Sequence, residues 1–192
     1  AGSVHFHRGE FALGAGFLRT GLANDDGTSP DRAEMMSALD RCERFIAMEA
    51  RLSHVLEDAA SLESHEETIA FASMCMQTRR YVSASRLFAR ALSPPTHLAV
   101  DARVQDSYNA ACAAALAASG AGPEAGALAD GERAEFRGRA RDLLLSNIAL
   151  VRRSLPDADG GTRAQIAREV RAWRTDPDLR AVRDDEFVNT MA

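Results

Sequence analysis

Residues 65–93, HEETIAFASMCMQTRRYVSASRLFARALS, decide the fold. Apolar residues recur at steps of three and four on both sides of the polar residues 77–80, so the stretch predicts two amphipathic helices joined by a short turn. Small and bulky side chains alternate along the two apolar faces: Ala72 and Ala84 among Phe71, Tyr81 and Phe88. The small residues mark the positions at which we expect the two helices to approach closely.

This order of small and bulky residues resembles the tetratricopeptide repeat, a helix–turn–helix unit of about 34 residues. The resemblance implies an all-α, tetratricopeptide-like α-α superhelix, a right-handed solenoid of antiparallel helix pairs. Residues 64–93 form the best repeat, with Ser64 and Glu67 at the spacing of a capping box. No segment of the 192-residue chain alternates apolar and polar residues as a strand does, so we expect one helical domain over residues 1–192.

On the N-terminal side, residues 1–23 have the pattern of a truncated repeat whose first helix is reduced to Gly2–His7. A repeat without that helix does not cover its apolar face, so we expect the natural protein to continue upstream. The side chains expected to be exposed are Val4, Phe6, Phe11 and Phe17. They predict self-association through this N-terminal edge.

Residues 31–58 predict a long helix from Asp31 to about Ala50, then a bend and a short helix over 52–57. On the C-terminal side, residues 103–154 predict a repeat whose two helices are separated by an inserted loop, 120–131. Residues 162–183 predict C-terminal capping helices, with Ile166, Val170 and the only tryptophan, Trp173, on one side.

Composition narrows the range of functions. The net charge is −5 and all 23 basic residues are arginine, so non-specific electrostatic binding of nucleic acid is not expected. No apolar run reaches the roughly 18 residues of a membrane span. Three widely spaced cysteines, Cys42, Cys75 and Cys112, fit neither a disulfide framework nor a zinc site and indicate a reducing, cytoplasmic location.

Four blocks, in order, carry a second resemblance: RCERFIAMEARLSHVL, RRYVSASRLFARAL, SYNAACAAALAASG and REVRAWRTDPDLRAVRD. Together they resemble the C-terminal region of planctomycete-type bacterial serine/threonine protein kinases, from about Phe11 to Asp184. The resemblance implies a kinase domain upstream. This chain itself has no glycine-rich phosphate loop, no His-Arg-Asp or Asp-Phe-Gly motif and no lysine, so it carries no kinase chemistry.

The residues that suggest catalysis or metal binding all have simpler explanations. His5-x-His7 has no further ligand nearby, so no metal site or cofactor is predicted. Cys112 suits a small buried thiol better than a nucleophile. Helix capping and solvation explain the paired acids better than catalysis does: Glu66-Glu67 and Asp184-Asp185-Glu186. The remaining histidines, His54, His65 and His97, are expected to be isolated and exposed.

The phase of the repeat predicts a concave groove that binds a peptide partner. Its candidate residues are Glu66, Ile69, Ser73, Met76 and Gln77 from one repeat, with Tyr108, Asn109, Cys112 and Leu116 from the next. Asn109 is expected to hydrogen-bond the backbone of an extended peptide. The favoured prediction for the alanine-rich segment 107–120 is nevertheless that it forms the packed core of the last repeats, and the peptide groove is the alternative.

The sequence therefore predicts a non-catalytic protein–protein interaction or scaffolding module that binds a protein or peptide and contacts no membrane. One alternative is a purely structural capping or oligomerisation segment. Another is a helical enzyme whose active-site loop is 120–131, which requires two or more buried titratable groups around a cavity.

Overall fold

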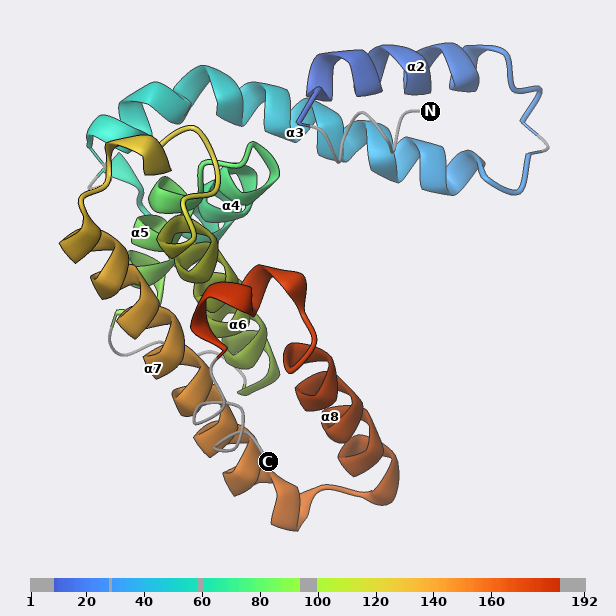
Figure 1. Cartoon of the computed structure of the whole chain (residues 1–192). Helices are drawn as coiled ribbons and strands as arrows, with labels where there is room; N and C mark the ends of the chain where they lie inside the picture. The colour runs from blue at the N-terminus through green and yellow to red at the C-terminus, as the bar shows by residue number, and fades with distance from the viewer. Residues whose placement is uncertain (1–8, 28, 59–60, 94–99, 184–192) are drawn as a thin grey trace. The chain divides into compact units, whose positions relative to one another are not determined.

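The structure is a computed structural model that describes residues 9–27, 29–58, 61–93 and 100–183. Every regular element in these ranges is helical, which confirms the predicted all-α class (Figure 1). A single domain was predicted, whereas the chain divides into two compact units, residues 1–64 and residues 65–192. None of the described helices is long and apolar enough to cross a membrane.

The first unit contains α2 (Phe11–Ala23), which packs along α3 (Arg32–Glu57). Its core cluster consists of Ala15, Leu18, Ala38 and Cys42. Phe11 is only 1% exposed, and its ring lies 4.8 Å from that of Phe45 between centroids. The expectation that Phe11 is exposed is therefore wrong, because the first turn of α2 directs this ring onto α3.

Phe17 is 52% exposed, as expected, whereas Val4 and Phe6 lie outside the described residues. Helix α3 is continuous over 26 residues, so the short helix predicted over 52–57 is the last part of α3. The helix contains neither Gly nor Pro, the usual causes of a kink.

The second unit begins with α4 (His65–Gln77) and α5 (Tyr81–Ala91), which flank the predicted turn. Arg79 adopts the left-handed conformation (φ 59°), and the N–H groups of Arg80 and Arg79 donate to the carbonyl oxygens of Cys75 and Met76. These are the two hydrogen bonds of a Schellman ending, with an arginine where glycine is usual.

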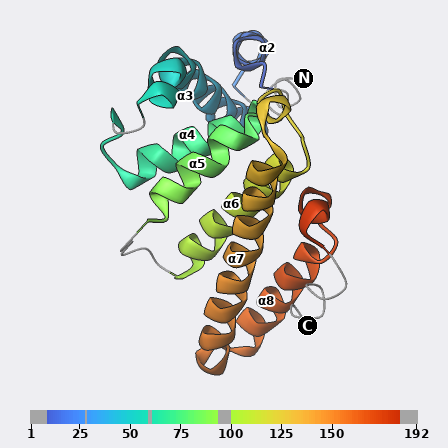
Figure 2. The ribbon, with the colours of Figure 1, turned by 60° about the vertical axis from the view of Figure 1, so that its left-hand side comes forward.

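The following helices are α6 (Val100–Ala118) and α7 (Asp130–Ser154). Helices α4 to α7 lie side by side in chain order, each packed against the next (Figure 2). After the short 3-10 helix η3 (Leu155–Asp157) come α8 (Gly160–Trp173) and the 3-10 helix η4 (Pro177–Val182). As predicted, Pro177 opens the last of these, and the side chain of Asp176 caps it by accepting from the N–H of Asp178.

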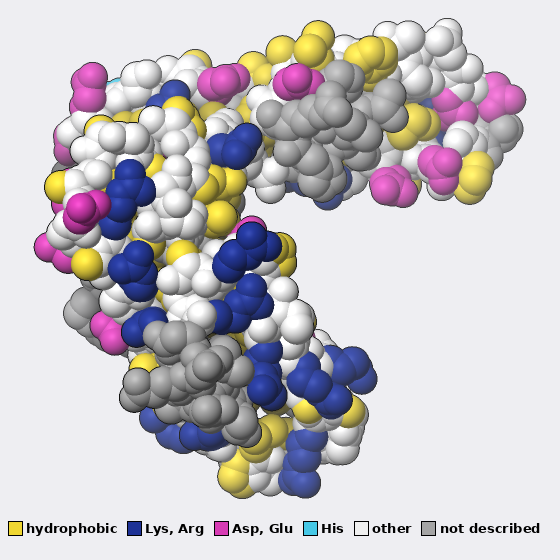
Figure 3. All heavy atoms as spheres, viewed as in Figure 1, with side chains coloured by type: hydrophobic (Ala, Val, Ile, Leu, Met, Phe, Trp, Pro, Cys, Tyr) yellow, Lys and Arg dark blue, Asp and Glu magenta, His cyan; other side chains and the backbone are white. Residues whose placement is uncertain are grey.

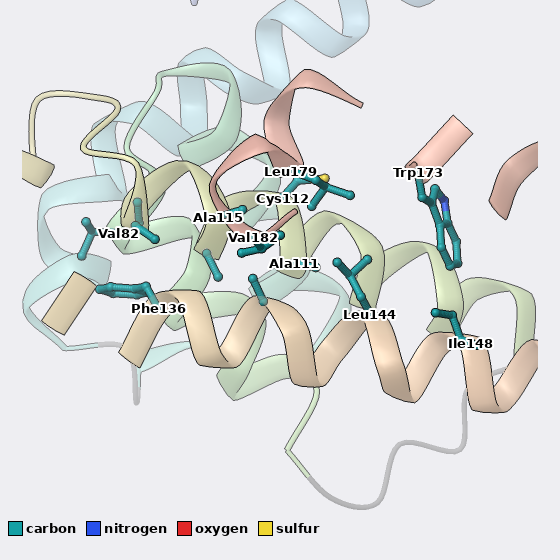
Figure 4. Close-up of a cluster of buried hydrophobic side chains, with 14 residues drawn as sticks. Val82, Ala111, Cys112, Ala115, Phe136, Leu144, Ile148, Trp173, Leu179 and Val182 are labelled. Carbon is teal, nitrogen blue, oxygen red and sulfur yellow. The ribbon is translucent and has the colours of Figure 1, made fainter. Parts of the chain in front are cut away.

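The main core of the second unit lies between α6, α7 and η4 (Figure 4). Helix α6 contributes small buried residues, namely Ala111, Cys112, Ala114, Ala115, Ala117 and Ala118. Larger side chains from the other elements fill the space around them: Phe136, Leu144, Ile148, Trp173, Leu179 and Val182. The alanine-rich segment is thus core, which was one of its two predicted roles.

The predicted loop 120–131 folds back onto the turn between α4 and α5. It includes the 3-10 helix η2 (Ala125–Ala127), in which Ala125 is fully buried. Glu124 accepts from the backbone N–H of Ser83 at 3.0 Å and from its hydroxyl at 2.6 Å. Ser83 lies in the first turn of α5, where N–H groups lack helical partners, so the loop caps a helix that has no capping side chain of its own.

Candidate functional site

Helix α8 is held chiefly at its C-terminal end. Trp173 is its only buried residue, while Ile166 and Val170 are half-buried and the others are exposed. Figure 4 shows Trp173 extending towards the α7 residues Leu144 and Ile148. A groove lies on each side of α8.

The anchor of α8 is a contact between Tyr108 of α6 and Trp173. The two rings stack with centroids 5.1 Å apart and planes 18° from parallel. The hydroxyl of Tyr108 also donates a hydrogen bond to Asp176, the residue that caps η4. One tyrosine thus fixes both the end of α8 and the start of η4.

Burial, followed by the hydrogen bond to Asp176, raises the pKa of Tyr108 well above its ordinary value, so the hydroxyl remains a neutral donor. Burial likewise raises the pKa of the neighbouring Cys112 to about 12, with a further contribution from the charge of Asp176. A thiol with this pKa is not an activated nucleophile at neutral pH. The predicted buried, unreactive role of Cys112 therefore agrees with its environment.

The first groove, called the α6–α8 groove, has a volume of about 410 Å³. It is lined by Val104, Gln105, Tyr108, Val151, Ser154, Thr162, Gln165, Ile166, Glu169 and Trp173. The two stacked aromatic rings and three aliphatic side chains give it an apolar surface, and the amides and hydroxyls supply hydrogen-bonding groups. The polar and apolar parts of this surface are similar in extent, and ligand sites combine apolar surface with placed polar groups.

The titratable groups of this groove do not form the buried cluster that the enzyme alternative requires. Glu169 is exposed and accepts a hydrogen bond from Gln165 at 3.1 Å, and Tyr108 is held neutral. Within the described ranges, no group of three His, Cys, Asp or Glu side chains is arranged to bind a metal ion.

Of the nine predicted groove residues, Tyr108 lines the α6–α8 groove. Glu66 is exposed on α4, whereas the other four α4 residues are half-buried: Ile69, Ser73, Met76 and Gln77. Met76 packs against the main core, and Asn109 accepts a hydrogen bond from Gln105 at 3.1 Å. Leu116 is half-buried, but Cys112 is only 4% exposed, so its predicted place facing a partner is wrong.

His65 also differs from expectation. Its Nδ1 lies 3.0 Å from the carbonyl oxygen of Ala91, which can only accept, so Nδ1 carries the proton. Its Nε2 lies 3.8 Å from Asp106 on α6. The histidine is thus half-buried between helices and is not isolated, whereas His54 is exposed as predicted and His97 lies outside the described residues.

Four residues of α8 line the groove without having been predicted to do so: Thr162, Gln165, Glu169 and Trp173. The available signal was the lone tryptophan at the end of an apolar stripe, which indicates an anchoring side chain but not an open groove. No protein-family model, curated protein or solved structure matches the chain. Its function is therefore inferred from its fold and its grooves.

Proposed function

We propose that this chain is a non-catalytic protein-interaction module that binds an extended peptide in the α6–α8 groove. The observation that carries the proposal is the open, aromatic-lined groove beside α8. Gln105 and Gln165 lie exposed along it, and each amide both donates and accepts hydrogen bonds, as a peptide backbone requires. The apolar surface between them suits side chains of the same peptide.

The succession of packed helices in the second unit supports a tetratricopeptide-like solenoid as the architecture of this module. Together with the resemblance of the four sequence blocks, it also supports a role as the C-terminal repeat region of a larger bacterial protein, with a serine/threonine kinase domain as the expected neighbour. In that setting the module would bring a partner or substrate to the kinase.

The test begins with selection of binding peptides from a random library against the purified chain. Gln165→Arg fills the groove from an exposed helical position, so it is expected to weaken selected peptides at least tenfold while the fold is retained. Ala164→Arg is the matched control, because Ala164 is exposed next to it on α8 and lines neither groove beside that helix. Binders that resist Gln165→Arg, or equal losses in both variants, would overturn the proposal.

A further inference from the structure

A second groove, called the α7–α8 groove, lies on the other side of α8 and has a volume of about 320 Å³. Six aliphatic side chains line its apolar part: Ile148, Val151, Leu155, Ile166, Ala167 and Val170. Val151 and Ile166 also line the α6–α8 groove, so they separate the two spaces. Facing helical stripes of this kind normally pack directly on one another, whereas here a groove lies between them.

The polar part of the α7–α8 groove consists entirely of arginines: Arg152, Arg163, Arg171 and Arg174. No carboxylate lines the groove, and within the described ranges none forms an ion pair with these four side chains. Two of the guanidinium groups are held in place by backbone carbonyl oxygens. Arg163 donates to Leu155 and Pro156, both at 3.2 Å, and Arg171 donates to Ala167 at 3.0 Å.

Each of these arginines retains further N–H donors, because a guanidinium carries five. The excess of positive charge is local: residues 146–183 contain eight arginines and five carboxylates, although the chain has a net charge of −5. Figure 3 shows arginine side chains gathered over α8 with apolar atoms exposed among them. The groove therefore combines aliphatic surface with guanidinium groups that have no ion-pair partner among the described residues.

We propose that the α7–α8 groove binds an acidic peptide segment that carries at least one large apolar side chain. Carboxylates would pair with Arg152 and Arg171 in charge-assisted, often bidentate hydrogen bonds, while the apolar side chain fills the aliphatic part. Nucleic acid fits less well, because the groove has no aromatic side chain on which a base stacks. This site is separate from the one in the proposed function and adds a second, charge-selective contact.

The chain itself contains a sequence of this kind. Residues 184–192, DDEFVNTMA, combine three acids with Phe187 and Val188, and they follow Arg183, which donates to the carbonyl oxygen of the groove residue Arg174 at 2.6 Å. The peptide DDEFVNTMA, labelled with fluorescein, is therefore a suitable probe. Two altered peptides separate the contributions of charge and apolar contact: NNQFVNTMA lacks the acidic side chains, and DDESSNTSA, with serine in place of Phe187, Val188 and Met191, lacks the large apolar side chains.

Fluorescence anisotropy with the full chain at low salt should show saturable binding of the probe, at least tenfold weaker binding of both altered peptides, and weaker binding as salt increases. Arg171→Gln and Arg152→Gln should each weaken binding of the probe at least fivefold. Arg168→Gln is the matched control, since Arg168 is an exposed α8 arginine that lines neither of the two grooves, and it should leave binding unchanged.

Equal losses for Arg168→Gln and Arg171→Gln would overturn the proposal, because they would indicate a diffuse charge effect. Binding seen only after deletion of residues 184–192 would assign the groove to the chain's own end and would overturn binding in trans. Tighter binding of an oligo-dT strand, lost in Arg171→Gln, would replace the peptide with nucleic acid. Gln165→Arg, which alters the α6–α8 groove, should leave the probe bound. Failure of the α7–α8 proposal can therefore be distinguished from failure of the proposed function.

Discussion

Glu124 and Ser83 are separated by 41 residues, yet the carboxylate of Glu124 accepts from both the backbone N–H and the hydroxyl of Ser83. Arg80 adds a cation 3.9 Å from the same carboxylate. The loop that joins α6 to α7 is thereby tied to the start of α5. A loop that looks like an unstructured insertion in sequence is a structural part of the second unit.

Glu124→Ala should lower the free energy of unfolding by about 2 kcal/mol, because it removes two hydrogen bonds to a charged group and leaves an N–H of α5 without its partner. Chemical denaturation would measure the loss. The double variant with Ser83→Ala should lose less than the sum of the two single variants. Strict additivity would show that the two residues contribute independently.

Gly122→Ala should destabilise the chain by more than about 1 kcal/mol. Gly122 has φ +79°, and an added Cβ would lie 2.1 Å from the carbonyl oxygen of Arg79. Gly126→Ala, in the same loop, is the control, since its Cβ would meet nothing within 4 Å. Similar midpoints for the two variants in urea unfolding would contradict the close approach of this loop to the turn.

Trp173→Ala should destabilise the second unit by about 3–5 kcal/mol, the usual range for a buried tryptophan. Since Trp173 is the only buried residue of α8, the helix should also become more sensitive to trypsin at Arg168 and Arg171. Trp173→Phe keeps an aromatic ring against Tyr108, so it should lose less stability and α8 should remain protected from trypsin. Equal proteolysis of wild type and Trp173→Ala would show that α8 is held by other contacts.

Tyr108→Phe should lower the free energy of unfolding by about 1 kcal/mol at neutral pH, because it removes the hydrogen bond to Asp176. The pKa of Tyr108 is raised in the folded state, whereas an unfolded tyrosine has a pKa of about 10. Above that pH the unfolded chain therefore releases a proton that the folded chain retains, and stability falls as pH rises. Unfolding measured from pH 9 to 11 should show a smaller decline in Tyr108→Phe than in wild type.

The three cysteines should resist a thiol reagent such as DTNB in the native chain at pH 8 and should all react once the chain is denatured. All three are buried, and burial raises the pKa of both Cys75 and Cys112 to about 12. Unfolded thiols have a pKa of about 8.5, so these groups stabilise the fold less as pH rises above that value. Rapid native reaction at Cys112, identified by mass spectrometry, would contradict its core position.

The helical class, the turn after α4 and the proline that opens η4 were predictable, because each depends on residues close together in sequence. The continuity of α3 was also readable from its lack of glycine and proline. The burial of Phe11 was not predictable, because helical spacing does not specify which neighbouring element a side chain contacts. The candidate site was harder to predict: Tyr108 was identified as a groove residue, but helical spacing does not specify that Trp173 of α8 stacks on its ring.

The contact of loop 120–131 with the start of α5 has a consequence for how the second unit unfolds. Stacks of helix pairs that touch only their neighbours lose structure one pair at a time, so their stability is distributed along the chain. Here the connection between α6 and α7 also holds the turn before α5, and opening either pair removes a support of the other. The four helices should melt in one cooperative step, and a cut between α5 and α6 should yield no half that folds alone.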